Sequence, residues 1–275
     1  EKVILKWQRS EPVDPSRLTE AFRRQAERIL TMGLEELPGY KFDCVCGRTH
    51  RIDMEHLLSG SGALERLPEV LGSAEEQKER TILLLCDRNT WEAGGRKTDE
   101  LLRAAGFRTK ILELSTKNYP VLIPDEAALG TILVHVTDDV GILLGVGSGT
   151  ISDLTKLVSY KTGRRSVVVG TAPSMDGYAS MNAAFVIGGH KITYPAHYHS
   201  CIVADTGIMK DAPMELMRAG YGDVVGKYTE LSDWRRPSTT SIIVKLQRGL
   251  CRMQSISASP TRNGISVVRR MPWNA

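Results

Sequence analysis

Between residues 80 and 205, hydrophobic positions form short uninterrupted runs, and stretches with helical periodicity separate most of these runs. Such runs are typical of strands that are buried on both faces of a parallel sheet. The predicted strands are Thr81–Cys86, Phe107–Leu114, Ile142–Leu144, Arg165–Val169 and Cys201–Ala204. The predicted helices between them cover about residues 90–105, 125–136 and 151–160. The pattern therefore predicts an α/β fold with helices on both faces of a parallel sheet.

The periodicity changes on either side of this region. Residues 15–32 are predicted to form an amphipathic helix, and Gly188–Gly189 marks the turn of a hairpin that spans residues 184–193. A helix is predicted from Pro213 to a stop near Gly220, and a second helix is predicted to begin around Gly222. No structure is predicted beyond residue 235, where the sequence is rich in Ser and Thr.

Three glycines lie where the predicted strand ending near Leu144 turns into a helix, in the stretch Gly145–Asp153. Glycine permits a positive φ and lets a ligand approach the main chain closely. The first turn of the following helix offers free N–H groups and the positive end of the helix dipole. The turn therefore suits a diphosphate, and a strand–helix turn without a ligand is the alternative.

Polar residues follow other predicted strands. Asp87 ends the first strand, where a carboxylate can accept both hydroxyls of a ribose, although it can equally cap the next helix. Thr171–Ser180 carries several hydroxyls and the carboxylate of Asp176, and a plain connecting loop is its alternative. Asp223 lies near a predicted helix start, which by itself favours a capping role, and Lys227 is one turn further on.

Two groups of potential metal ligands are not predicted to bind metal. Cys44 and Cys46 precede His50, but their C-x-C spacing and the lack of a second cluster argue against structural zinc. His197 and His199 have no carboxylate nearby in the sequence, so exposed or hydrogen-bonded roles are expected for them.

The composition of the 275 residues is that of a globular protein, with 41% hydrophobic and 25% charged residues. No apolar run is long enough to cross a membrane, and the N-terminal residues lack the apolar region of a signal peptide. The five cysteines form no disulfide pattern, so the expected location is the cytoplasm.

The charge is divided unevenly along the chain. Residues 236–275 carry seven Lys and Arg residues and no Asp or Glu, whereas residues 1–235 carry 29 positive and 32 negative side chains. The basic tail lacks an accompanying pattern of aromatic residues, so binding of nucleic acid is not expected.

Taken together, these motifs resemble the glycerol-1-phosphate dehydrogenase family, within the larger group of dehydroquinate synthase-like proteins and iron-containing alcohol dehydrogenases. The resemblance covers roughly residues 35–235 and rests on Cys86–Thr90, Gly147–Asp153, Thr171–Ser180, Ala204–Thr206 and Gly220–Glu230. It implies a Rossmann-like nucleotide-binding domain over residues 1–204. The start of a helical metal- and substrate-binding domain would follow over residues 205–235, with a divergent basic tail over 236–275.

The resemblance also implies an activity, namely reduction of dihydroxyacetone phosphate to sn-glycerol 1-phosphate with NADH or NADPH and a divalent metal ion, zinc or nickel. Cofactor-binding roles are implied for Asp87, Gly147, Ser148, Gly149, Thr150, Ile151, Thr171, Ser174 and Ser180. Asp176 would contact the substrate, and Asp223 would bind both the metal and the substrate, which makes these two the implied catalytic residues. An Asp rather than a Glu at position 223 favours a dehydrogenase over a dehydroquinate synthase.

The chain departs from the family in its histidines. The family completes its metal site with two histidines of the helical domain, but no histidine follows His199 in this chain. We therefore expect an incomplete helical domain, partly retained cofactor binding and turnover that is weak or absent. A related polyol or alcohol dehydrogenase and a non-catalytic nucleotide-binding protein are the alternatives. Asp87 favours NAD over NADP by charge, and a homo-oligomer is left open.

Overall fold

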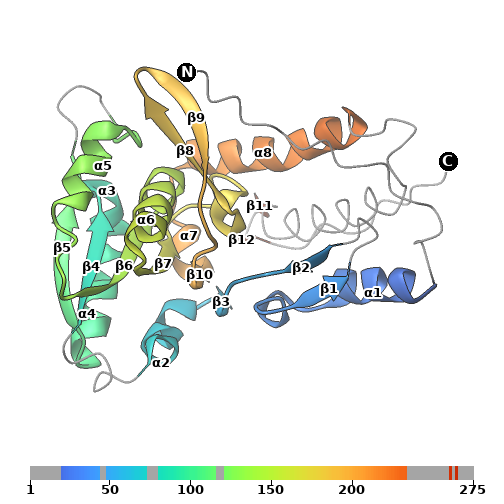
Figure 1. The fold of residues 1–275 in the computed structure, drawn as a ribbon, viewed down its shortest axis with the longest axis horizontal. Helices are drawn as coiled ribbons and strands as arrows, with labels where there is room; N and C mark the ends of the chain where they lie inside the picture. Colours follow the sequence, from blue (N-terminus) through green and yellow to red (C-terminus); the bar gives the residue numbers. More distant parts are fainter. Residues whose placement is uncertain are drawn as a thin grey trace.

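The computed structural model describes residues 20–43, 48–72, 80–115 and 121–233, together with the two-residue strands β11 (Pro260–Thr261) and β12 (Gly264–Ile265). Its centre is a six-stranded sheet with the strand order β3-β10-β7-β6-β4-β5, in which every neighbouring pair is parallel (Figure 1). The strands are β3 (His56–Gly60), β4 (Thr81–Cys86), β5 (Arg108–Glu113), β6 (Val140–Gly147), β7 (Arg165–Gly170) and β10 (Cys201–Asp205). The predicted parallel sheet is confirmed, and β3 is an edge strand that the hydrophobic pattern did not predict.

Strand β4 shows why the sheet is buried on both faces. Ile82, Leu84 and Cys86 pack into one hydrophobic cluster, while Leu83 and Leu85 pack into a second cluster on the opposite face. All five side chains are at most 1% exposed, as expected when side chains of a strand alternate between two covered faces.

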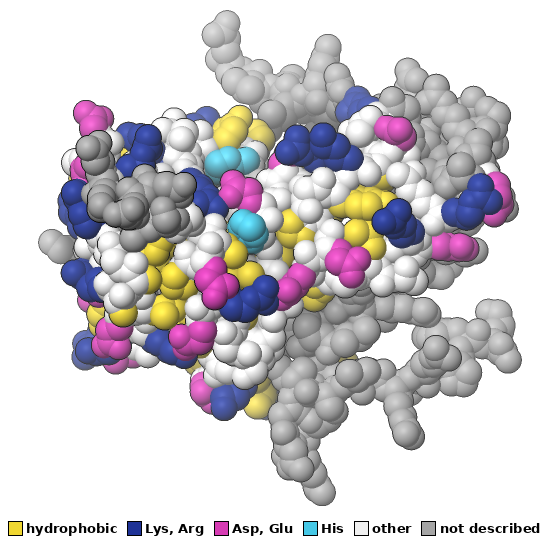
Figure 2. All heavy atoms as spheres, turned by 90° about the horizontal axis from the view of Figure 1, so that it is seen from below, with side chains coloured by type: hydrophobic (Ala, Val, Ile, Leu, Met, Phe, Trp, Pro, Cys, Tyr) yellow, Lys and Arg dark blue, Asp and Glu magenta, His cyan; other side chains and the backbone are white. Residues whose placement is uncertain are grey.

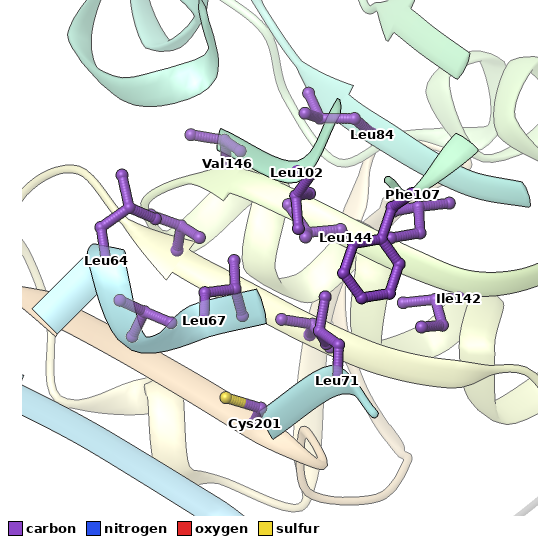
Figure 3. Packing of buried hydrophobic residues seen from close by; sticks show 14 of the residues in the cluster. Leu64, Leu67, Leu71, Leu84, Leu102, Phe107, Ile142, Leu144, Val146 and Cys201 are labelled. Carbon is purple, nitrogen blue, oxygen red and sulfur yellow. The ribbon is translucent and has the colours of Figure 1, made fainter. Parts of the chain in front are cut away.

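Helices cover both faces of the sheet. The first face is covered by the 3₁₀ turn η3 (Ala63–Arg66), α2 (Leu67–Leu71) and α4 (Arg96–Ala104). Figure 3 shows Leu64, Leu67 and Leu71 of this layer beside strand residues such as Leu144 and Ile142. The second face is covered by α5 (Glu126–Leu133), α6 (Gly149–Thr162) and strand β8 (Asn182–Ile187). The predicted helix over residues 90–105 consists of α3 (Arg88–Thr90), the π-helical turn η4 (Trp91–Gly95) and α4.

The predicted hairpin is confirmed as β8 and β9 (His190–Pro195), joined by Gly188 and Gly189 with φ values of 58° and 77°. Two positive φ angles are the requirement of a type I′ turn, which explains the glycine pair. The predicted N-terminal helix is observed as α1 (Glu20–Thr31), followed by the 3₁₀ turn η2 (Leu34–Glu36) and the antiparallel strands β1 (Lys41–Asp43) and β2 (Thr49–Arg51). No helix among the described residues is long and apolar enough to cross a membrane.

The expected helix break at Gly220 is wrong. Helix α8 (Met214–Asp233) runs through Gly220 and Gly222 without interruption. A Cβ atom at position 220 would overlap the carbonyl oxygen of Pro173 and lie 2.8 Å from its carbonyl carbon. The glycine therefore allows α8 to pass directly over the loop that follows β7, rather than ending the helix.

Candidate functional site

The order of the strands creates a crevice at one edge of the sheet. The chain leaves β4 through α4 to reach β5 on one side, and then returns through α5 to β6 on the other side of β4. Because α4 and α5 cover opposite faces of the sheet, a space opens between the carboxyl ends of β4 and β6. Ligands of open α/β sheets bind at this kind of topological switch point.

A cleft of about 1210 Å³ lies at this edge. Of the residues that the sequence predicts to bind cofactor, the cleft is lined by Asp87, Ser148, Thr150, Ile151 and Thr171. Its lining also includes Asp205 at the end of β10 and Pro213 and Leu216 at the start of α8. The structure therefore gathers on one cleft five predicted residues that are spread over 85 positions of the sequence.

Asp87 fulfils the capping role that the sequence left as an alternative. Its Oδ1 atom accepts a hydrogen bond of 2.8 Å from the backbone N–H of Thr90, and Thr90 Oγ1 accepts one of 2.9 Å from the backbone N–H of Asp87. Within the described part of the chain, Oδ2 of Asp87 accepts no hydrogen bond. One carboxylate oxygen therefore fixes the start of α3, and the other is available to a ligand in the cleft.

The turn from β6 into α6 leaves backbone donors available at the cleft. Ser148 is the N-cap of α6, and its side chain makes no capping hydrogen bond. The first helical bond runs from Ser152 N to Ser148 O, so the N–H groups of Gly149, Thr150 and Ile151 precede it. Such a helix start suits an anionic diphosphate.

A positive φ was the expected reason for the glycines of this turn, but none of them adopts one. They are required instead because neighbouring atoms leave little room for a side chain. A Cβ atom at Gly147 would lie 2.6 Å from Ile151, and one at Gly149 would lie 3.3 Å from Met175 Sδ. The glycines thus let α6 and the loop after β7 pack closely against the turn. Gly147 and Gly149 support the turn without lining the cleft.

The remaining predicted cofactor-binding residues lie on the loop after β7, and only some of them face the cleft. Thr171 is 6% exposed and faces the cleft, whereas Ser174 and Ser180 are absent from its lining. Ser180 Oγ instead accepts a hydrogen bond of 3.1 Å from Asn182 N at the start of β8. Asp176 lies between them and contacts α8.

Asp176 forms a cluster with Asp223, Lys227 and Glu230 of α8, which we call the α8–loop cluster. The backbone N–H of Asp176 donates a 2.9 Å hydrogen bond to Asp223 Oδ2. Lys227 Nζ lies 3.0 Å from Asp176 Oδ2, 3.9 Å from Asp223 Oδ1 and 3.1 Å from Glu230 Oε2. Burial acts to lower the pKa of Lys227, but hydrogen bonds to Asp176 and Glu230 outweigh it and hold the pKa above its ordinary value.

The two histidines of the region after β9 are hydrogen-bonded to serine side chains. His199 is fully buried, with Nε2 3.0 Å from Ser152 Oγ and Nδ1 2.6 Å from Ser166 Oγ. His197 Nε2 lies 2.8 Å from Ser159 Oγ. This confirms the expectation of hydrogen-bonded histidines.

The described residues by themselves do not form a metal site. They contain no group of three or more His, Cys, Asp or Glu side chains arranged to hold an ion. One carboxylate oxygen of Asp223 already accepts from Asp176, and the other faces the ammonium of Lys227. Cys44 and Cys46 lie outside the described residues.

Asp205 is a residue whose importance the sequence analysis missed. Its carboxylate is 2% exposed and accepts hydrogen bonds from the backbone N–H groups of Gly62, Leu64 and Gly207, at 3.2, 3.0 and 2.8 Å. It thereby ties the end of β10 to the turn after β3, at the rim of the cleft. The available signal was an Asp at a strand end, as for Asp87, but two of its partners lie more than 140 positions away.

Comparison with known proteins agrees with this geometry. A sequence model described as iron-containing alcohol dehydrogenase matches residues 58–213, which include the whole six-stranded sheet apart from the first two residues of β3. The chain belongs to the iron-containing alcohol dehydrogenase family. Within this family it is similar to the glycerol-1-phosphate dehydrogenase [NAD(P)+] of Halalkalibacterium halodurans, with 34% identity over 194 residues, 70% of this chain and 48% of the relative. It is also 34% identical to the protein of the same name from Geobacillus stearothermophilus, over 74% of this chain and 50% of the relative.

These comparisons confirm the resemblance that the motifs indicated, and the chain spans about half the length of the curated relatives it matches. Solved structures of the iron-containing alcohol dehydrogenase group share the fold. A glycerol dehydrogenase from Schizosaccharomyces pombe superposes with a TM-score of 0.53 at 19% identity, covering 65% of this chain and 44% of that one. An archaeal halo-thermophilic alcohol dehydrogenase from a Red Sea brine pool gives 0.56 at 13% identity, covering 79% and 65%. At these identities the likeness shows the fold alone.

Proposed function

We propose that the chain binds NAD or NADP in the cleft at the switch point and serves the reduction of dihydroxyacetone phosphate to sn-glycerol 1-phosphate. The observation that carries the proposal is the meeting of Asp87, the uncapped start of α6 and Thr171 on one cleft. The curated relatives, which are named glycerol-1-phosphate dehydrogenases, support the choice of reaction.

The residues divide the work of holding the cofactor. Oδ2 of Asp87 accepts from the hydroxyls of the adenosine ribose, and the backbone N–H groups of Thr150 and Ile151, which line the cleft, donate to the diphosphate. Thr171 lines the nicotinamide end, and Ser174 and Ser180 belong to the same loop. When bound, the reduced nicotinamide supplies the hydride.

The substrate is proposed to meet Asp176 and Asp223, with Asp176 contacting it directly. The described residues do not by themselves form a metal site, and zinc or nickel at Asp223 stays a prediction. The chemistry assigned to this chain is therefore orientation of cofactor and substrate across the edge of the sheet.

Fluorescence titration of NADH into the purified chain tests the cofactor site. Asp87→Asn keeps a capping oxygen but removes the charge, so the fold should persist while NADH binding weakens by about tenfold or more. NADPH should lose less affinity than NADH, because the repulsion of a 2′-phosphate is also removed. The matched control is Asp125→Asn, since Asp125 caps α5 through Ala128 N at 2.8 Å and does not line the cleft.

Equal NADH affinity in wild type and Asp87→Asn would contradict the proposed ribose contact. Oxidation of NADH by dihydroxyacetone phosphate in the same samples tests the reaction itself. Binding of NADH without turnover would support the alternative of a nucleotide-binding protein without catalytic activity.

A further inference from the structure

One side of α8 holds the loop that carries Asp176. Gly220, Asp223 and Lys227 are spaced by three and four residues, so they lie along one stripe of the helix. Gly220 passes against the Pro173 carbonyl, Asp223 accepts from the Asp176 N–H, and Lys227 contacts the Asp176 carboxylate. The loop is therefore fastened at successive turns of α8.

This fastening brings two carboxylates together. The backbone N–H of Asp176 donates a hydrogen bond to the carboxylate of Asp223, so the two residues are in direct contact. The side chain of Asp176 is 24% exposed and that of Asp223 is 36% exposed. Two neighbouring carboxylates repel each other, so a cation close to both of them stabilises their approach. In proteins this cation is either a metal ion or a basic side chain.

The geometry identifies a basic side chain. Lys227 Nζ is at hydrogen-bonding distance from Asp176 Oδ2, faces Asp223 Oδ1, and is itself only 23% exposed. A divalent ion placed between Asp176 and Asp223 would meet the Lys227 ammonium as a like charge, and the described residues offer it no group of three ligands.

We propose that Lys227, in place of a divalent metal ion, supplies the positive charge that holds Asp176 against Asp223 in this chain. Lys227 is then a positioning residue, which sets the place of Asp176 without itself reacting. The arrangement forms in the metal-free protein, and a metal ion can enter only by displacing the ammonium. This inference does not depend on the identity of the substrate.

Hydrogen exchange in the chain stripped of metal by a chelator tests the proposal. Exchange of the backbone N–H groups of residues 171–180 reports how firmly α8 holds the loop. Lys227→Met should speed this exchange by about tenfold, whereas Lys227→Arg should retain most of the protection. The matched control is Lys210→Met, because Lys210 is exposed after α7 (Thr206–Met209) and forms no ion pair within the described part.

Two further variants separate charge compensation from a general loss of structure. In Asp176→Asn combined with Lys227→Met, one negative charge is removed together with the positive one, so slow exchange should return. Titration with Zn²⁺ should give the same stoichiometry in wild type and Asp223→Asn, because zinc held elsewhere is unaffected by this change.

Three results would overturn the proposal. One is unchanged exchange in Lys227→Met without metal. The second is exchange in the double variant as fast as in Lys227→Met. The third is a zinc ion that wild type binds and Asp223→Asn loses. Hydrogen exchange and zinc titration require neither NADH nor dihydroxyacetone phosphate. Loss of NADH binding or of turnover would therefore bear on the proposed function alone.

Discussion

Substitution of Gly220 by alanine tests whether α8 packs directly on the loop after β7. A Cβ atom at this position would overlap the Pro173 carbonyl oxygen, and Ser174 C lies only 3.2 Å away. These are backbone atoms, so no side-chain rotation can relieve the contact. Either the loop or the helix must move.

The magnitude follows from comparison with a second glycine of the same helix. At Gly222 an added Cβ has nothing within 4 Å, so Gly222→Ala isolates the gain in helix stability, about 0.5–1 kcal/mol. Gly220→Ala has the same gain but suffers overpacking, which typically costs about 1–3 kcal/mol. The free energies of unfolding of the two variants should therefore differ by about 1–3 kcal/mol, with Gly222→Ala the more stable.

Urea unfolding followed by circular dichroism measures this difference, and NADH titration shows whether the displacement reaches the cleft through Pro213 and Leu216. Equal free energies of unfolding for Gly220→Ala and Gly222→Ala would refute the direct packing of α8 on the loop. The displaced loop should also be seen as faster hydrogen exchange at residues 171–180 in Gly220→Ala than in Gly222→Ala.

The remaining predictions concern buried polar side chains. Asp205→Asn should lower the free energy of unfolding by about 1.5–3 kcal/mol, because a buried carboxylate that accepts hydrogen bonds from three N–H groups is replaced by a neutral amide. Urea unfolding measures this difference. As a control, Asp211→Asn should change the free energy of unfolding little, because Asp211 is exposed. Burial, with Lys156 and His197 acting in the same direction, holds the pKa of His199 well below its ordinary value. The unfolded chain therefore binds a proton below about pH 6.5 that the folded chain rejects, so stability should fall with pH below this value by up to about 1.4 kcal/mol per pH unit. His199→Gln should make this slope shallower in urea unfolding at several pH values, and an unchanged slope would contradict the assignment.

The expectation that nucleic acid is not bound concerned the basic tail, residues 236–275, most of which lie outside the described residues. On the face shown in Figure 2, the described Lys and Arg side chains are interspersed with Asp and Glu side chains rather than forming one basic surface.

The sequence predicted the sheet well because its signals are local. The bounds predicted for β4 agree with the structure, since a run of buried apolar residues between polar ones requires no knowledge of distant contacts. The same holds for the glycine pair of the β8–β9 hairpin, whose positive φ angles are a property of the turn itself. Strand β3 was missed because an edge strand of mixed polarity carries little of this signal.

The structural roles of several residues depend on tertiary contacts that the sequence pattern does not reveal. Gly220 suggested a helix end, because a glycine within a helix usually weakens the helix. In the structure the glycine is needed inside α8 because the Pro173 carbonyl, from the loop after β7, packs directly against it. The partners of Asp205 and the pairing of Lys227 with Asp176 likewise join segments far apart in the chain. Local pattern and a family resemblance therefore determined the fold class and the candidate residues of this protein. Only the folded chain decided which of them share one cleft and which are joined through Lys227, because close approach between distant segments depends on how the whole sheet packs.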